Sequence, residues 1–154
     1  MNYPFISCKC ITYGRVATLE ESIESFLKQD YPADKCELII VNDYPLQTLI
    51  FDHPQVKVVN LVKTFETIGE KENYATELCQ GDIICQWDDD DVALPNHLNN
   101  VAKYMTEEVN ILHWQTGVLC HVTGIENVDL HWEITNNNTY EIIKSDEISI
   151  SFNQ

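Results

Sequence analysis

Basic residues are scarce in this chain of 154 residues, which carries 9 Lys and Arg against 25 Asp and Glu. The net charge of −16 argues against nucleic acid as a partner, because binding to nucleic-acid phosphates needs lysine and arginine. An anionic small molecule can still bind such a chain if a metal ion or a group of backbone amides offsets its charge. The composition therefore favours a small ligand over a nucleic acid.

Long apolar runs, paired cysteines and glycine-rich loops are also missing. No run reaches membrane-spanning length, and no basic segment precedes an apolar one at the N-terminus, so we expect neither a transmembrane segment nor a signal peptide. The six cysteines form no C-x-x-C pair, which argues against structural zinc and favours reduced thiols in a cytoplasmic protein. Without a phosphate loop or a nucleophile motif, a nucleotidyltransferase or phosphatase is disfavoured.

Short apolar, β-rich segments alternate with segments of helical periodicity over the first two thirds of the chain. We expect strands at residues 5–12, 37–41, 56–61 and 82–87. This alternation predicts an α/β fold with a mainly parallel central sheet flanked by helices. With 44% hydrophobic residues, the chain is long enough for one domain with a single core, over residues 1–154.

The ends of the expected helices carry capping signals. Two Thr/Glu pairs have the spacing of a capping box, Thr18 with Glu21 and Thr67 with Glu70. Gly81 stands where a helix commonly ends, and Pro95 suits the first position of a third helix. Beyond residue 108 the pattern is less regular and rich in β segments, at residues 110–112, 118–122, 128–134 and 140–143, with a turn at 136–138.

Four consecutive aspartates, residues 88–91, directly follow the apolar stretch of residues 83–87. Two like charges about 5 Å apart repel by roughly 3 kcal/mol at an effective dielectric constant near 20. At the end of a buried strand, such a run indicates a hard divalent cation, Mg²⁺ or Mn²⁺, which takes carboxylate and phosphate oxygens as ligands. A solvated acidic loop is the alternative interpretation.

Polar and aromatic residues end the other strands on the same side of the expected sheet. Thr12 and Tyr13 end the first strand, and Asp43 ends the second. Open α/β sheets bind ligands beyond the carboxyl ends of their strands, so these groups and the aspartates should converge. They would form a nucleoside diphosphate site. The Tyr13 ring would stack on the base, Asp43 would accept from the base or the ribose, and a metal at the aspartates would hold the phosphates. Structural roles are the alternatives, as edge packing for Tyr13 and as a turn before Pro45 for Asp43.

The order and spacing of these segments resemble those of a family-2 glycosyltransferase. The resemblance is carried by residues 5–15, 20–26, 29–32 and 38–43, and by residues 81–91 with Pro95, which include an Asp-x-Asp motif. It covers roughly residues 4–106. It implies a Rossmann-like GT-A fold, with a nucleotide-sugar-binding half at residues 1–106 and a shortened, β-rich acceptor-side half at residues 107–154.

The resemblance also implies an activity. A hexosyl group would pass from a nucleotide sugar, expected to be a UDP-sugar as the family's commonest donor, to a glycan, lipid or protein acceptor. Mn²⁺ or Mg²⁺ would bridge the diphosphate. By position, the nucleotide-sugar site comprises Thr12, Tyr13, Asp43 and Asp89, and the metal ligands are Asp88 and Asp90. Lys71 is added to the nucleotide-sugar site as the candidate substitute for an arginine of the family pattern. The sequence leaves the oligomeric state open.

Glu72 departs from the family pattern, because a donor-contacting arginine is expected at its position. The neighbouring Lys71 cannot make the planar, bidentate contact of arginine, and it should point elsewhere on the helix. A solvated glutamate on a surface helix is the alternative interpretation of Glu72.

The second departure is the short segment of 63 residues after Asp91. In the family, a longer segment builds the acceptor site and supplies a carboxylate base. Asp146 is the candidate general base here, with Asp129 and Glu133 as further candidates. The alternative function is that of a truncated or degenerate member, which binds a nucleoside diphosphate, a metal or a partner chain without efficient transfer.

Overall fold

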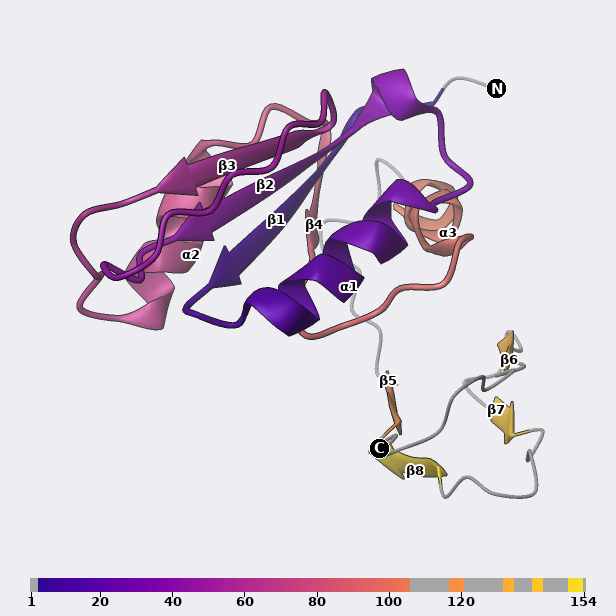
Figure 1. Ribbon diagram of the computed structural model, residues 1–154. Coiled ribbons are helices and arrows are strands. Elements are labelled where there is room, and N and C mark those ends of the chain that lie inside the picture. The colour runs from indigo at the N-terminus through magenta and orange to yellow at the C-terminus, as the bar shows by residue number, and fades with distance from the viewer. Residues whose placement is uncertain (1–2, 106–116, 121–131, 135–139, 143–149, 154) are drawn as a thin grey trace. The chain divides into compact units, whose positions relative to one another are not determined.

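The computed structural model describes residues 3–105 and, beyond them, the backbone of four short strands at residues 117–120, 132–134, 140–142 and 150–153 (Figure 1). The chain divides into two compact units, Met1–Ile111 and Leu112–Gln154. The expectation of one domain over residues 1–154 stays a prediction. The first unit contains the α/β part and all of the side chains whose contacts are described below.

Four parallel strands form the central sheet in the order β3-β2-β1-β4 (Figure 1). They are β1 (Ile6–Thr12), β2 (Cys36–Asn42), β3 (Val56–Asn60) and β4 (Ile83–Gln86). Each lies at a segment predicted from its apolar character, with ends that differ by at most one residue. The structure therefore confirms the parallel α/β sheet.

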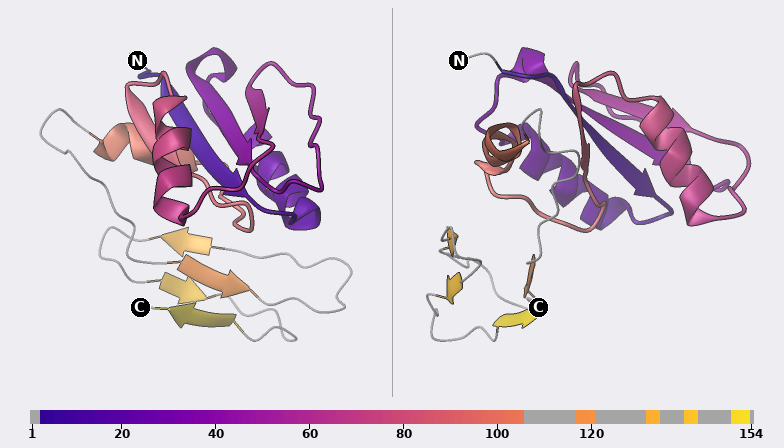
Figure 2. Two further views of the ribbon diagram at one scale, coloured as in Figure 1. Left: turned by 90° about the vertical axis from the view of Figure 1, so that its left-hand side faces the viewer. Right: turned by 180° about the vertical axis from the view of Figure 1, so that it is seen from behind.

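Helices lie on both faces of this sheet. Helices α1 (Val16–Leu27) and α3 (His97–Tyr104) pack on one face, and α2 (Ile68–Glu77) packs on the other (Figures 1 and 2). A short 3-10 helix, η1 (Ala33–Lys35), leads into β2. This arrangement confirms the predicted sheet with helices on its two faces.

The alternation of side chains along β1 and β2 explains why both faces are buried. One face packs against Phe26 of α1 and Leu98 of α3 through Ile6, Cys8, Cys10, Leu38 and Ile40. The opposite face packs Ile39 and Val41 against Ala75 of α2. Since full burial of such an apolar side chain contributes about 1.5–3 kcal/mol, the near-continuous apolar run of β2 stabilises both layers at once.

The two predicted capping boxes have different outcomes. In α2 the box is confirmed, because the backbone N–H of Glu70 donates to Oγ1 of Thr67 at 3.1 Å and the N–H of Thr67 donates to Glu70 at 3.2 Å. The box at Thr18 is wrong. Helix α1 already begins at Val16 with Arg15 at its N-cap, so the Thr18 hydroxyl lies in the first turn and donates to the Arg15 carbonyl at 3.2 Å.

The predicted positions of Gly81 and Pro95 are also wrong. Helix α2 ends at Glu77, four residues before Gly81. A Cβ on Gly81 would lie 2.5 Å from the Ser7 nitrogen, so glycine is required there for the chain to pass close to β1. Helix α3 begins at His97, two residues after Pro95. Pro95 therefore lies in the preceding loop, where its carbonyl accepts from the N–H of Asp30 at 2.7 Å.

The second unit contains two antiparallel strand pairs. Strand β5 (Gly117–Cys120) pairs with β8 (Ile150–Asn153), and β6 (Trp132–Ile134) pairs with β7 (Tyr140–Ile142). Three of these strands overlap predicted β segments, whereas β8 was not predicted. The segment at residues 110–112 and the turn at 136–138 lie outside the described residues, as do Asp129 and Asp146. Glu133 lies in β6, of which the backbone is described.

Five cysteines are free thiols in the described part of the chain, and four of these are buried. Burial raises the pKa of Cys10 and that of Cys36. The reduced state agrees with the sequence interpretation, and the cytoplasmic location stays a prediction. Among the described residues, no helix combines the length and the apolar character that crossing a membrane requires.

Candidate functional site

The strand order creates a switch point between β1 and β4. From β1 the chain proceeds to β2 and β3 on one side, and then returns to place β4 on the other side of β1. A hydrogen bond from the N–H of Trp87 to the carbonyl of Lys9, at 2.9 Å, continues this pairing beyond β4. Ligands of open α/β sheets bind at such a point, beyond the carboxyl ends of the strands. Tyr13 follows the last residue of β1 at this point, and Asp88 follows the last paired residue beyond β4.

Asp43 is held rigidly at the end of β2. It is only 2% exposed, and its Oδ2 accepts from the backbone N–H of Phe65 at 3.0 Å. Its Oδ1 forms an ion pair with Lys71, and its backbone carbonyl accepts from the Thr64 hydroxyl at 3.0 Å. The segment after β3 and helix α2 are therefore both fastened to this one residue.

Lys71 is directed into the site, contrary to the expectation that it points elsewhere on the helix. Its side chain is buried, and besides its ion pair with Asp43 its Nζ donates to the carbonyl of Thr12 at 2.7 Å. The same ammonium lies 5.9 Å from the centroid of the Tyr13 ring, within the range of a cation–π contact. Lys71 thus joins the ends of β1 and β2.

Thr12 and Tyr13 present a polar atom and an aromatic ring at the end of β1. Thr12 is buried, and among the described residues its Oγ1 has no hydrogen-bond partner. Buried hydroxyls without a partner are rare and call for an explanation, of which a ligand is one. The half-exposed Tyr13 ring lies 4.8 Å from that of Tyr44, tilted by 57°. Gly14, with φ of +75°, turns the chain there.

Arg15 binds two members of the aspartate run, a role that the sequence analysis missed. Its guanidinium forms an ion pair with Asp89, which is 1% exposed, with a second bond from Nε to Oδ2 at 3.2 Å. Its Nη1 also lies 2.6 Å from Oδ2 of Asp90, whose side chain is 47% exposed. The available signal was an arginine at the ligand-binding edge of a chain with only 9 basic residues.

Asp88 is fixed through its backbone and its side chain. Its carbonyl accepts from the Ser22 hydroxyl of α1 at 2.8 Å, and its Oδ1 accepts from Nε2 of Gln86 at the same distance.

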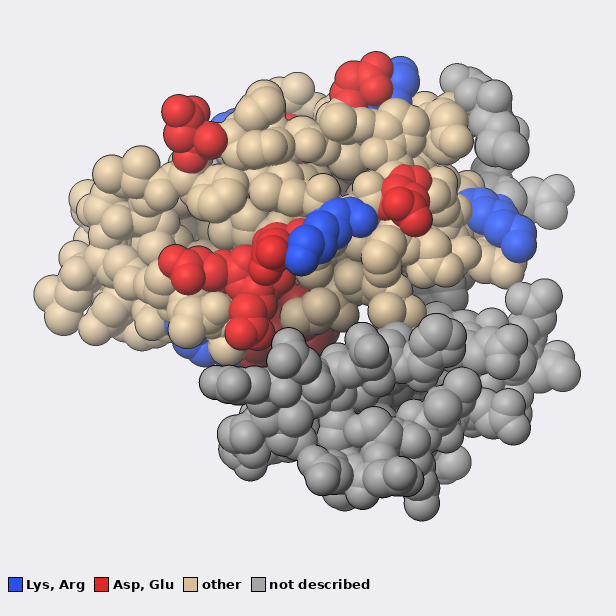
Figure 3. Space-filling view, turned by 45° about the vertical axis from the view of Figure 1, so that its right-hand side comes forward, with Lys and Arg blue, Asp and Glu red and all other residues tan. Residues whose placement is uncertain are grey.

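The last aspartate of the run, Asp91, has a raised pKa. Partial burial is the main cause, and the negative charges of Asp88, Asp90 and Asp89 add to it. Figure 3 shows one face of the molecule on which acidic side chains gather beside a basic side chain.

Asp88 and Asp90 suit a hard divalent cation as carboxylate ligands. No group of three or more His, Cys, Asp or Glu side chains in the described part of the chain is arranged to hold a metal. Two carboxylates from the described residues would leave positions in the coordination shell for substrate phosphates and water. Such a division is usual for Mg²⁺, and Mn²⁺ favours the same oxygen ligands.

Glu72 is not a solvated surface residue, so that interpretation is wrong. Its carboxylate forms an ion pair with Lys9 of β1, and its side chain is 25% exposed. The side-chain amide of Gln86 also donates to Glu72, at 3.2 Å. The position where the family pattern has an arginine therefore faces the neighbouring strands in this chain.

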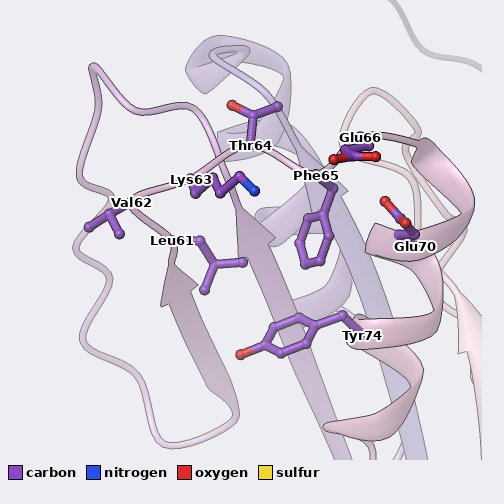
Figure 4. Close-up of a pocket in the computed structure, with 8 residues that line it drawn as sticks. All are labelled: Leu61, Val62, Lys63, Thr64, Phe65, Glu66, Glu70 and Tyr74. Atoms are coloured by element: carbon purple, nitrogen blue, oxygen red, sulfur yellow. The ribbon is translucent and has the colours of Figure 1, made fainter.

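An open pocket of about 570 Å³ lies between the segment after β3 and helix α2. Leu61, Phe65 and Tyr74 face one another across it, and Glu66 and Glu70 lie near the start of the helix (Figure 4). None of the predicted donor-binding residues is among the described residues that line it. The N–H of Phe65 connects its wall to Asp43.

The family model named Glycosyl transferase family 2 matches residues 9–153, and the chain therefore belongs to this family. The chain is 33% identical over 113 residues to YwdF of Bacillus subtilis (strain 168), named an uncharacterized glycosyltransferase. This match covers 70% of the chain and 40% of YwdF. The suspected family is thus confirmed.

Solved structures confirm the GT-A fold. TarS 1-349 of S. aureus matches with a TM-score of 0.57 and 21% identity over 88% of this chain and 43% of that one. The mannosyltransferase PcManGT from Pyrobaculum calidifontis, solved with GDP-Man and Mn²⁺, matches with a TM-score of 0.59 and 21% identity, over 80% and 37%. The chain thus spans less than half the length of each of these relatives.

Proposed function

We propose that this chain forms the donor site of a metal-dependent glycosyltransferase, which transfers a sugar from a nucleotide sugar to a glycan, lipid or protein acceptor. The observation that carries the proposal is the convergence of unlike groups at the switch point. An unpartnered buried hydroxyl on Thr12, an exposed ring on Tyr13 and the carboxylates after β4 lie at neighbouring strand ends. Together they provide groups for the nucleoside and for the diphosphate of a nucleotide sugar.

The nucleoside would occupy the end of β1. The exposed Tyr13 ring would stack on the base, and Thr12 would bond to the ligand through its free Oγ1. Asp43 already accepts one bond at each carboxylate oxygen, but each oxygen has a second lone pair for a base N–H or a ribose hydroxyl. The Lys71 ammonium has three N–H groups and donates to Asp43 and to Thr12. The third N–H would donate to the nucleotide sugar.

The diphosphate would lie beside the aspartate run. Asp88 and Asp90 would hold Mn²⁺ or Mg²⁺, and Asp89 would lie near the ribose or diphosphate. When bound, the cation would act as a Lewis acid on the leaving nucleoside diphosphate. Before the cation arrives, Arg15 offsets one of the two negative charges of Asp89 and Asp90, and its half-exposed side chain would move away from Asp90 when the cation binds.

UDP is the nucleotide that we propose. The TarS fragment has been solved with UDP-GlcNAc and with UDP, whereas PcManGT has been solved with GDP-Man and Mn²⁺. These complexes support a nucleotide-sugar donor and a divalent cation for this chain. Asp146 remains the proposed general base, ahead of Asp129 and Glu133.

A second candidate function is binding of the nucleotide and metal without efficient transfer. The ion pair of Glu72 with Lys9 favours it, because this pair stands where the family pattern has a donor-contacting arginine. Slow hydrolysis of a nucleotide sugar by the wild-type protein would favour the enzyme over the binding protein.

The melting temperature of the protein with UDP, GDP, CDP or dTDP, each with and without Mn²⁺, tests the donor site. One of the four should raise it by several degrees only with Mn²⁺, since a ligand at 100 times its Kd stabilises by about 2.7 kcal/mol. Asp90→Ala should abolish the shift. The matched variant Asp52→Ala, at an exposed aspartate outside the site, should retain it. No response to any nucleotide would contradict the proposal.

A further inference from the structure

Glu72 replaces an expected arginine, yet its side chain is fully engaged. Its two carboxylate oxygens have separate partners, with Oε2 paired to Nζ of Lys9 and Oε1 accepting from Nε2 of Gln86. Lys9 and Glu72 are both mostly buried, at 15% and 25% side-chain exposure. This pair is therefore a fixed point on the α2 face of the sheet.

Gln86 extends from this fixed point to the aspartate run. Lys9 and Gln86 are register partners on the adjacent parallel strands β1 and β4, so their side chains stand next to each other on one face of the sheet. The Gln86 amide nitrogen has two N–H groups. It donates to Glu72 at 3.2 Å and to Oδ1 of Asp88 at 2.8 Å.

We propose that Gln86 is a positioning residue for the metal ligand Asp88, and that the Lys9–Glu72 pair acts on Asp88 through it. The Ser22 hydroxyl fixes the Asp88 backbone, and the Gln86 amide fixes the carboxylate. The order of contacts is Lys9, Glu72, Gln86, Asp88. Glu72 thus serves the metal site from a distance and makes no contact with the donor.

This inference rests on the proposed metal site, and it predicts a measurable change in metal affinity. Partners that orient a metal-binding carboxylate typically change metal affinity 10- to 100-fold when they are removed. Loss of the Gln86 amide should leave the Asp88 side chain with several rotamers, only some of which face the metal. Gln86 is exposed, so replacing it should not disturb the core.

Mn²⁺ titration in the presence of the nucleoside diphosphate that stabilises the protein tests the inference without measuring transfer. The electron paramagnetic resonance signal of free Mn²⁺ follows binding, and the Mn²⁺ bound by the nucleotide alone is subtracted. Gln86→Leu should weaken Mn²⁺ binding about 10-fold while the melting temperature of the metal-free protein stays within about a degree. The matched variant Gln80→Leu, at an exposed glutamine after α2, should bind Mn²⁺ like the wild type.

The second variant, Lys9→Met with Glu72→Leu, keeps the net charge and removes both the ion pair and the carboxylate that accepts from Gln86. It should weaken Mn²⁺ binding several-fold, because Gln86 loses its anchor. Adding the same two changes to Gln86→Leu should cost nothing further, since the pair acts only through Gln86. A triple variant clearly weaker than Gln86→Leu would overturn the proposed order of contacts.

The failures of the two proposals are distinguishable. If the wild type binds no Mn²⁺ with any of the four nucleoside diphosphates, the metal-dependent function itself is wrong. If the wild type binds Mn²⁺ and Gln86→Leu or the charge-neutral pair variant binds within twofold of it, the positioning role is wrong and the proposed function stands.

Discussion

The two acidic positions at the ligand-binding edge of the sheet differ in how their charge is balanced. Asp43 is buried, and Phe65 and Lys71 satisfy its two carboxylate oxygens from fixed positions. In the aspartate run, the half-exposed Arg15 offsets only part of the negative charge, and Asp90 is nearly half exposed. The first position is already complete without a ligand, whereas the second has excess negative charge. We therefore propose that the fold alone builds the nucleoside side of the site and that the diphosphate side needs a cation.

The largest effect should come from breaking the buried pair. Lys71→Met leaves the Asp43 carboxylate buried with one backbone partner, and breaking such a pair costs about 3–5 kcal/mol. Urea unfolding should show this loss of unfolding free energy. Lys71→Met combined with Asp43→Asn should recover most of it, because no buried charge is then left unpaired. A loss below about 1 kcal/mol for Lys71→Met would contradict the rigid character of this half.

The next effect should appear in ligand affinity. Asp90→Asn removes a proposed metal ligand and should weaken Mn²⁺-dependent nucleotide binding about 100-fold, which corresponds to about 2.7 kcal/mol. Isothermal titration of the nucleotide in Mn²⁺ measures it. Because the side chain is nearly half exposed, the unfolding free energy should change little. Unchanged nucleotide affinity would remove Asp90 from the metal site.

Breaking the Arg15 pairs should have a smaller effect on stability than breaking the Lys71 pair. Arg15→Met leaves Asp89 buried and unpaired, but water can reach the place of the half-exposed guanidinium, so we expect a loss of about 1–2 kcal/mol. Adding Asp89→Asn should restore most of the unfolding free energy. A loss for Arg15→Met that exceeds the loss for Lys71→Met would reverse the proposed contrast between the two halves.

The smallest effect should be that of Asp91→Asn, and it should depend on pH. The folded-state pKa of Asp91 is raised above its ordinary value of 3.8, so the unfolded chain releases this proton first. Wild-type stability should therefore fall, relative to the variant, as pH rises from about 3.8 to the raised pKa, and the gap should then stay constant. Solvent screening should keep the gap below about 1 kcal/mol.

Urea unfolding of the wild type and the variant across this pH range measures the gap. Mn²⁺ with UDP should narrow it at neutral pH, because a bound cation offsets the repulsion among the aspartates. A gap that grows as pH falls would contradict the crowding of like charges in this run.

The strands could be predicted because each one carries its own signal. Residues 37–41 form a near-continuous apolar run, which is typical of a strand that is buried on both faces of a sheet. This signal is local and does not depend on which strands pair with it. The errors fell at the helix ends. The turn at Gly14 starts α1 before Thr18, and Gly81 is required by its contact with Ser7, which lies 74 residues earlier in the sequence. Local spacing does not contain such tertiary contacts.

The candidate site was predictable to the extent that its residues follow strand ends. Asp43 and the aspartate run lie where the parallel sheet places them. Their partners were not predictable. Arg15 and Asp89 are 74 residues apart in the sequence. With 25 acidic and 9 basic residues, the sequence does not show which acid pairs with which base. Lys71 was chosen from the family resemblance, but its ion pair with Asp43 depends on how α2 packs.

The metal dependence of nucleotide binding tests the central claim most directly. We would titrate the wild-type protein calorimetrically with the nucleoside diphosphate that raises its melting temperature most, once in Mn²⁺ and once in EDTA. Binding should be at least about 100-fold tighter in Mn²⁺, with the weak metal-free binding lost in Asp43→Ala. Equal affinity in Mn²⁺ and EDTA would contradict the assignment of the aspartate run as the half of the site that needs a cation.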